Sequence, residues 1–109
     1  MVVPFPYADR LAEKRRPAVI VSGREMRDNG LVWLAMVTSG RNAGWSCDVA
    51  INDLETAGLP APSIVRPWKL ATVDVARIAG VVGKLPDREL GPVMERIRTV
   101  LDLSSPPTR

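Results

Sequence analysis

The chain of 109 residues contains no histidine, a single cysteine and only three lysines, and no apolar run in it approaches the ~18 residues of a membrane span. Without histidine, the Ser-His-Asp and Cys-His nucleophile systems and histidine-liganded zinc are excluded. The lone Cys47 excludes an intramolecular disulfide and a thiolate metal cluster, and a small buried apolar role is expected for it. Any catalysis must therefore use arginine, lysine, carboxylate or hydroxyl groups.

The overall composition, with 46% hydrophobic and 25% charged residues, is typical of an ordinary soluble domain. The length fits one domain. Twelve of the fifteen basic residues are arginines, and the net charge is +3. Because arginine binds phosphate through paired N–H groups and stacks on flat rings, this bias favours a nucleic-acid or acidic protein partner. The first residues carry no basic flank of a targeting signal, so we expect a cytoplasmic protein without membrane contact.

The alternation of apolar and polar segments predicts five or six short strands. They are expected over residues 1–6, 17–22, 31–37, 47–51, 63–72 and 78–85. Pro4 and Pro6 are expected to end the first strand, because neither can donate a ladder hydrogen bond. Polar segments at 8–16, 24–30 and 40–44 are predicted as loops, the last with two glycines at positive φ. A short helix is expected to begin at Asn52 and to stop at Gly58.

Residues 86–101 carry the clearest pattern, that of an amphipathic helix. Its apolar face, at steps of three and four, consists of Leu90, Val93, Met94, Ile97, Val100 and Leu101. The opposite face is expected to consist of Arg88, Glu89, Glu95, Arg96 and Arg98. Since no crossover helices separate the strands, the pattern predicts a mainly β (α+β) domain over residues 1–103, with a strongly bent antiparallel sheet and one closing helix. Residues 104–109 are expected to be a disordered tail.

Two polar clusters at strand ends could hold a phosphate. The run Lys14-Arg15-Arg16 precedes a predicted buried strand, which would hold a cation in place at the surface, although most such runs are solvated loops. The second cluster consists of Thr38, Ser39, Gly40, Arg41 and Asn42. Hydroxyl, amide and guanidinium groups in one turn can surround a phosphate, and a plain capping turn explains them equally well.

A third cluster lies in the segment after Ser63, where Arg66 and Lys69 flank Trp68. A cation beside an aromatic ring is typical of sites that hold single-stranded bases. A tryptophan is nevertheless found more often in a core or an interface than as a stacking platform.

Taken together, these segments resemble the PemK/MazF toxins of bacterial toxin–antitoxin pairs. The matching segments run in order from Val2 to about Leu101, over residues 2–9, 14–22, 37–39, 58–65, 71–74, 78–80 and 83–85. The most specific parts are the Pro-Phe-Pro opening, the Arg-Pro-Ala-Val strand and the Thr-Ser strand end. The resemblance covers nearly the whole chain.

The resemblance implies a small SH3-like barrel with a C-terminal helix, usually homodimeric, that acts as a metal-independent endoribonuclease with no cofactor. It implies that Arg16 and Thr38 are the catalytic pair. Cleavage of single-stranded mRNA at a short sequence would proceed by attack of the ribose 2′-OH, leaving a 2′,3′-cyclic phosphate and a 5′-OH, so DNA should stay intact. The implied protein partner is an acidic antitoxin that covers the basic groove.

The chemistry of the residues limits their roles in such a reaction. Arg16 stays protonated, so we expect it to stabilise charge on the phosphate, while Thr38 donates a hydrogen bond or orients the 2′-OH. The remaining candidates for a general base are Asp9 and Glu13. The residues expected to bind RNA are Lys14, Arg15, Ser39, Arg41, Arg66 and Trp68.

Two departures from the family pattern leave an alternative. The first strand looks shortened at its start, and Trp68 stands where some members have an acid. The alternative is a non-catalytic or gyrase-directed homologue that acts by binding a protein, although Arg16 and Thr38 favour the nuclease.

Overall fold

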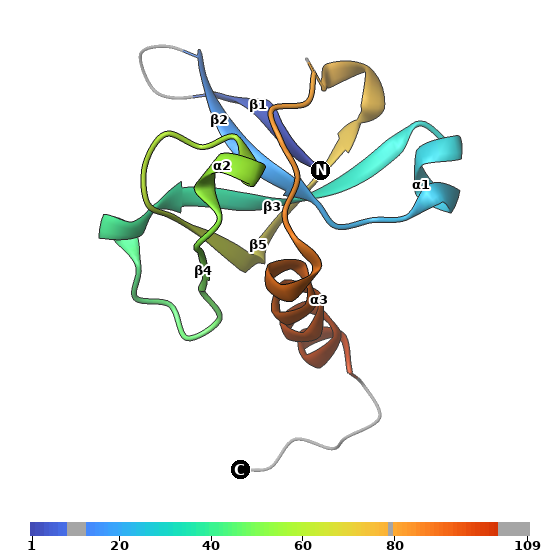
Figure 1. Ribbon diagram of the computed structural model, residues 1–109. Coiled ribbons are helices and arrows are strands. Elements are labelled where there is room, and N and C mark those ends of the chain that lie inside the picture. The colour runs from blue at the N-terminus through green and yellow to red at the C-terminus, as the bar shows by residue number, and fades with distance from the viewer. Residues whose placement is uncertain (9–12, 79, 103–109) are drawn as a thin grey trace.

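The computed structural model describes residues 1–8, 13–78 and 80–102, with their side chains except at 5–8 and 13–15. Five antiparallel strands form one sheet in the order β1-β2-β3-β5-β4 (Figure 1). The strands are β1 (Val2–Ala8), β2 (Glu13–Ile20), β3 (Leu31–Ser39), β4 (Val49–Ile51) and β5 (Ser63–Asp74). The helices are α1 (Arg24–Asp28), α2 (Leu54–Ala57) and α3 (Asp87–Leu101), with 3-10 turns at Gly40–Asn42 and Val75–Arg77. The expected α+β class and closing helix are confirmed, whereas the predicted tail at 104–109 lies outside the described residues.

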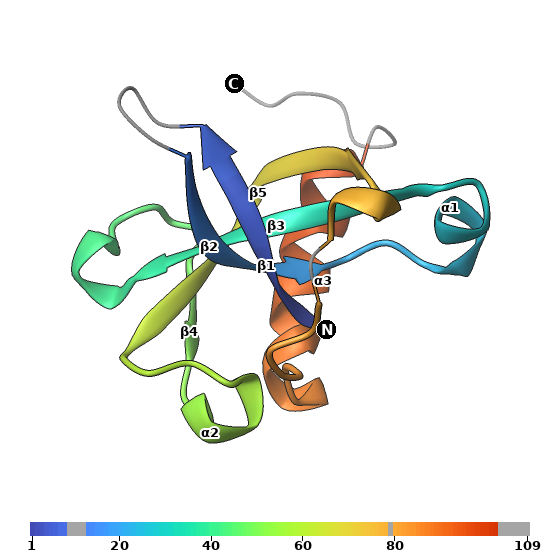
Figure 2. The same cartoon turned by 90° about the horizontal axis from the view of Figure 1, so that it is seen from above.

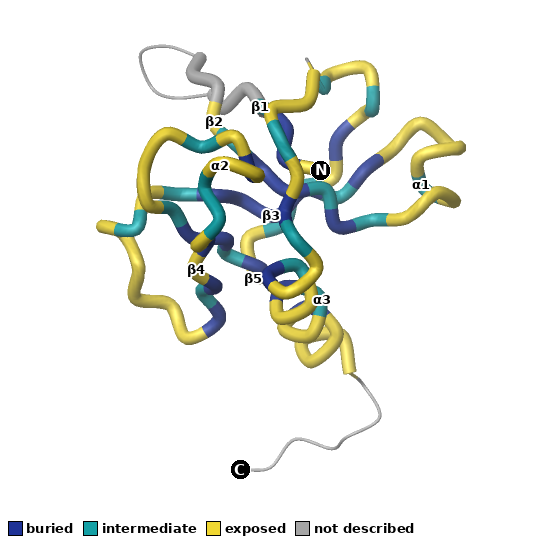
Figure 3. The backbone as a smooth tube through the Cα atoms, viewed as in Figure 1, coloured by how far each residue is buried: buried dark blue, intermediate teal, exposed yellow. Residues whose placement is uncertain are grey.

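Strand β3 lies at the middle of the sheet and is buried on both faces, which explains its nearly continuous apolar sequence. On one face Ala35 and Val37 belong to a core that includes Val93 and Ile97 of α3. On the other face Leu34 belongs to a second, smaller core under the 3-10 turn at Val75–Arg77. Figure 2 shows α3 crossing one face of the sheet, and Figure 3 shows the buried residues concentrated along the central strands.

Helix α3 follows the predicted period in its middle and departs from it at both ends. Val93 and Ile97 are buried, as expected, but Val100 and Leu101 in the last turn of the helix are each 53% exposed. Glu89, which we expected on the solvent face, is buried. Its Oε2 accepts hydrogen bonds from the backbone N–H groups of Asn52 and Asp53. A carboxylate in the first turn of α3 therefore joins this helix to the start of α2.

The hairpin of β1 and β2 is longer than the sequence predicted. Pro4 and Pro6 do not end β1, and β2 begins at Glu13, so the basic run that we expected in a loop is part of a strand. Pro4 lies opposite Pro17 in the register, so neither nitrogen faces the partner strand and no donor is missed between them. The same alternation turns the N–H of Val2 outward, where it donates to the carbonyl of Gly83 at 2.9 Å.

Residues 78–85 do not form the strand that we predicted from their apolar run. Their described part meets β1 in one isolated bridge, between Val2 and Gly83, and then crosses the end of α2. A Cβ at Gly83 would lie 2.3 Å from the backbone of Ala57, and a Cβ at Gly58 would lie 2.0 Å from the carbonyl oxygen of Val82. The close crossing thus requires glycine on both segments.

The prediction of positive φ for the two glycines of the 40–44 loop is wrong. Positive φ occurs instead at Gly30 and Gly58. Gly58, at φ 73°, ends α2 in the left-handed conformation. The N-cap of α2 is Asp53, one residue after the predicted start. The polar link at 24–30 contains the short helix α1, which buries none of its residues.

Strand β5 is interrupted by a bulge of three residues. Ala35 of β3 pairs with Leu70, and the next residue, Met36, pairs with Arg66. Residues 67–69 therefore have no partner on β3, and Pro67, which cannot donate a ladder bond, begins the bulge. The bulge separates the half of β5 that pairs with both β3 and β4 from the half that continues to the 3-10 turn.

Candidate active site

The candidate site lies where β2 separates from β3. Val21 donates its N–H to Trp33 of β3 at 3.0 Å, so by alternation the backbone nitrogens of Val19 and Pro17 also face β3. Pro17 has no hydrogen to donate, and the ladder accordingly stops at the pair of Ala18 and Met36. If the register continued, Pro17 would lie opposite Val37.

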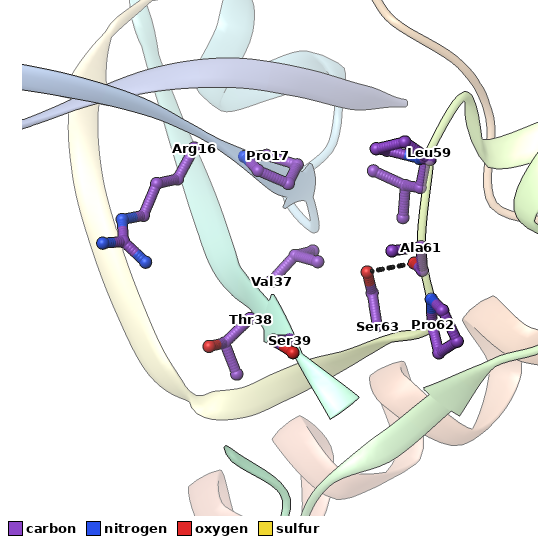
Figure 4. Close-up of a pocket in the computed structure, with 10 residues that line it drawn as sticks. Arg16, Pro17, Val37, Thr38, Ser39, Leu59, Ala61, Pro62 and Ser63 are labelled. Carbon is purple, nitrogen blue, oxygen red and sulfur yellow. Dashed lines mark hydrogen bonds between the residues drawn. The ribbon is translucent and has the colours of Figure 1, made fainter. Parts of the chain in front are cut away.

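One residue farther along this register, Arg16 would lie opposite Thr38. Both residues line one cavity of ≈ 220 Å³. Arg16 is exposed and Thr38 is half-buried. Figure 4 shows the guanidinium of Arg16 and the hydroxyl of Thr38 on the same side of the site, pointing away from residues 59–63. The sequence thus brings a cation and a hydroxyl together at the point where proline opens the sheet.

The opposite wall of the cavity is the segment between α2 and β5. It contributes Leu59, Pro60, Ala61 and Pro62, so this side of the cavity is mostly apolar. A second cavity of ≈ 180 Å³ shares Arg16, Pro17, Leu59 and Pro60 with the first. Two backbone bonds hold the wall: Leu59 donates its N–H to the carbonyl of Leu54 at 2.9 Å, and Gly40 donates to that of Pro62 at 3.0 Å.

The turn that follows Thr38 folds back on the end of β3. Asn42 donates its side-chain N–H to the hydroxyl oxygen of Thr38, with 2.8 Å between Nδ2 and Oγ1. Ser39 caps the 3-10 turn, because its hydroxyl oxygen accepts the backbone N–H of Arg41 at 3.2 Å. The capping role expected for this cluster is therefore present, and it coexists with a wall position for both Thr38 and Ser39.

Arg66 of β5 is engaged in a network with the loop between β3 and β4. Its Nε and Nη2 each lie 3.0 Å from an oxygen of Asp48, and Nη2 also donates to the carbonyl of Asn42 at 2.8 Å. The guanidinium lies over the ring of Trp45, 4.2 Å from its centroid. The side chains of Arg66 and Asp48 are 12% and 7% exposed.

This network fixes the charge of Asp48. The hydrogen bond from Arg66 lowers the pKa of the Asp48 carboxyl below its usual range, and N–H groups of Gly44 and Trp45 add to the effect against the opposing effect of burial. The carboxylate in turn raises the pKa of Arg66. A bidentate pair of this kind is geometrically specific. At neutral pH both groups are charged.

The other sequence-predicted residues are spread over the molecule. Arg41 is exposed in the turn after Ser39, at the same end of β3 as the cavity. Trp68 is 49% exposed and lies in the bulge of β5. The remaining candidates lie in or before β2, where Asp9 is outside the described residues and the side chains of Glu13, Lys14 and Arg15 are not described.

Sequence reasoning missed two parts of the site. It did not predict Asp48 as the partner of Arg66, and it did not predict the apolar wall of residues 59–62. The two prolines in that wall were a usable indication, because a segment with Pro at alternate positions forms no interior ladder. Asp48 carries no comparable local indication, because its partner Arg66 lies 18 residues away along the chain.

The described part of the chain holds neither a cluster of metal-ligating side chains nor a membrane-spanning helix. No group of three or more His, Cys, Asp or Glu side chains within it is placed to hold a metal ion. No helix within it is long and apolar enough to cross a membrane.

Comparison with protein families gives one match over nearly the whole chain. Residues 1–101 match the family described as PemK-like, MazF-like toxin of type II toxin-antitoxin system. Among curated proteins, none matches the sequence significantly.

Solved structures with the same fold include the following three. Mycobacterium tuberculosis toxin MazF-mt6 has a TM-score of 0.73 at 23% identity, over 96% of this chain and all of its own. The MazE-MazF structure (Form-III) from Deinococcus radiodurans has a TM-score of 0.74 at 21% identity, over 92% of this chain and 91% of that one. An endoribonuclease in complex with its cognate antitoxin, from a mycobacterial species, has a TM-score of 0.72 at 17% identity, over 96% and 94%.

Proposed function

Because the chain belongs to the family of PemK-like, MazF-like toxins of type II toxin–antitoxin systems, we propose that it is a sequence-specific endoribonuclease. It cleaves single-stranded mRNA without a metal ion, by attack of a ribose 2′-OH on the adjacent phosphate. The products are a 2′,3′-cyclic phosphate and a 5′-OH. The observation that carries the proposal is that Arg16 and Thr38, taken from separate strands, line one cavity.

Arg16 is proposed to stabilise the negative charge that develops on the phosphate oxygens during the attack. A guanidinium remains protonated at any physiological pH, so it acts as a fixed charge and as a hydrogen-bond donor, never as a base. Its exposed side chain suits a polyanionic substrate. The apolar wall across the cavity is well placed for a flanking nucleotide.

Thr38 is proposed to donate a hydrogen bond to the same phosphate. It stands at the end of a central strand that is buried on both faces, so its position is well defined. The proposed general base is either Asp9 or Glu13, and Glu13 is the first residue of β2. DNA lacks the 2′-OH nucleophile and is not cut.

The wider interface follows from the same resemblance. Ser39 and Arg41 adjoin the catalytic pair, and we propose that they bind RNA together with Lys14, Arg15, Arg66 and Trp68. The protein partner is proposed to be an acidic antitoxin, which the toxin–antitoxin complexes among the structural neighbours support. A homodimer and a closed SH3-like barrel are proposed on the same grounds.

The test is cleavage of a long single-stranded RNA by the purified protein in EDTA. We expect fragments with cyclic-phosphate and 5′-OH ends, and no cleavage of the matching DNA. Arg16→Ala and Thr38→Val should each lower kcat/KM roughly 10²–10³-fold, the usual loss when one group that stabilises transition-state charge is removed. Binding of uncleavable RNA by both variants should remain measurable.

Arg24→Ala is the matched control. Arg24 is also an exposed arginine, but it lies in α1, which precedes β3, whereas the cavity is at the other end of that strand (Figure 1). Full cleavage by Arg16→Ala would refute the assignment. RNA left intact by the wild-type protein would instead support the alternative, a toxin homologue that acts by binding a protein such as gyrase.

A further inference from the structure

We propose that Asp48 and Arg66 form a clamp that orients the Thr38 hydroxyl through Asn42, which makes all three positioning residues for the proposed cleavage. The inference rests on the proposed function and adds to it a set of residues with a defined role. It starts from an ion pair that the family comparison does not assign.

The clamp holds the loop between β3 and β4 at several points. Arg66 donates to the carbonyl of Asn42 at 2.8 Å, while Asp48 accepts the N–H groups of Gly44 and Trp45 at 3.1 and 3.0 Å. Arg66 and Asp48 bind each other through two bonds of 3.0 Å. One largely buried ion pair thus ties residues 42–45 to strand β5.

The clamp leaves the side chain of Asn42 free to reach back to the active site. Its Nδ2 donates to Oγ1 of Thr38 at 2.8 Å. A hydroxyl has one hydrogen to donate and two lone pairs to accept with. Because Asn42 occupies a lone pair with an N–H, the hydroxyl hydrogen of Thr38 must point elsewhere. The contact therefore sets Thr38 as a donor, which is the role that a phosphate oxygen requires.

This arrangement gives Arg66 a positioning role in addition to the RNA contact proposed for it. Two of its nitrogens are committed to Asp48 and to the carbonyl of Asn42, and its flat face lies against Trp45. Its side chain is only 12% exposed. An arginine so placed fixes a loop with bidentate geometry that lysine does not reproduce.

The experiment measures kcat and KM on a defined RNA for the wild type, Asn42→Ala and Asp48→Asn. We expect each substitution to lower kcat about tenfold or more, with KM changed less than about twofold, since an orienting contact acts on the reaction step. Asn42 is exposed, so Asn42→Ala tests the contact even if Asp48→Asn disturbs folding. The matched control, Arg88→Gln, breaks the exposed ion pair with Asp53 and should leave kcat unchanged.

Measuring Asn42→Ala in the Thr38→Val variant distinguishes an effect on the orientation of the Thr38 hydroxyl from a general loss of stability. In Thr38→Val there is no hydroxyl to orient, so adding Asn42→Ala should lower kcat no further. An equal loss in both backgrounds would overturn the proposal, as would an unchanged kcat in Asn42→Ala.

Hydrogen exchange does not depend on activity, so it tests the clamp separately from the proposed endoribonuclease function. Asp48→Asn should speed the hydrogen exchange of the Gly44 and Trp45 amides, and Arg88→Gln should not. Unchanged exchange in Asp48→Asn would refute the clamp. If the wild type cleaved no RNA while this exchange result held, only the proposed function would fail.

Discussion

Replacing Gly58 with alanine should destabilise the protein far more than the same change at Gly30. Both glycines have positive φ, 73° at Gly58 and 85° at Gly30, so both variants incur the left-handed cost of about 1–2 kcal/mol. At Gly30 nothing lies within 4 Å of the added Cβ. At Gly58 the Cβ would lie 2.0 Å from the carbonyl oxygen of Val82, and moving that backbone costs a further ~1–3 kcal/mol.

We therefore expect losses in the free energy of unfolding of about 1–2 kcal/mol for Gly30→Ala and about 2–5 kcal/mol for Gly58→Ala. Both variants lose the same unfolded-state freedom, so this effect cancels in their difference. The assay is urea unfolding followed by tryptophan fluorescence. With a slope of about 1–3 kcal/mol per molar, the midpoints should differ by roughly 1 M. Equal midpoints would refute the close approach of α2 and residues 82–83.

Two further predictions concern buried carboxylates. Glu89→Ala should lower the free energy of unfolding by about 1–3 kcal/mol, because two backbone N–H groups lose their acceptor. Glu95 is exposed, so Glu95→Ala should change the free energy of unfolding by less than about 0.5 kcal/mol. Urea unfolding of both variants measures the two effects, and equal effects would contradict the prediction. The folded state holds the pKa of Asp48 below its usual value, so the stability gained from that charge is complete above about pH 4 and declines as the pH falls through the folded pKa. The difference in unfolding free energy between the wild type and Asp48→Asn should therefore shrink below about pH 4, and a constant difference from pH 7 to pH 3 would count against the pair.

The sequence predicts those elements whose sequence pattern reflects their burial. The apolar run of β3 indicates a strand, and the spacing of Val93 and Ile97 indicates a helix. Both patterns are informative because they follow which side chains are buried. The pattern does not predict a strand that forms through backbone pairing alone. Residues 13–16 are charged, yet they form part of β2 because the β1 ladder pairs their backbones.

Long-range contacts explain the other differences. Glu89 looks like a solvent-face residue in the period of α3, and only the arrival of the Asn52 and Asp53 amides makes its burial tolerable. The apolar run at 78–85 resembles a strand, but it meets α2 at glycine contacts that no local pattern contains. In the site, Arg16 and Thr38 are predicted by resemblance, and Pro17 explains in physical terms why they face one opening.

The two prolines of β1 have a consequence for how other chains can bind. At Pro4 and Pro6 the outward backbone nitrogens carry no hydrogen, and the N–H of Val2 is taken by Gly83. A strand added along this edge would find carbonyl acceptors but would leave its own facing carbonyls unpaired, at about 1–3 kcal/mol for each one buried. The edge thus resists extension of the sheet by another chain, as prolines at sheet edges do generally. A protein partner, including a second copy of this one, therefore gains little from adding a strand along β1.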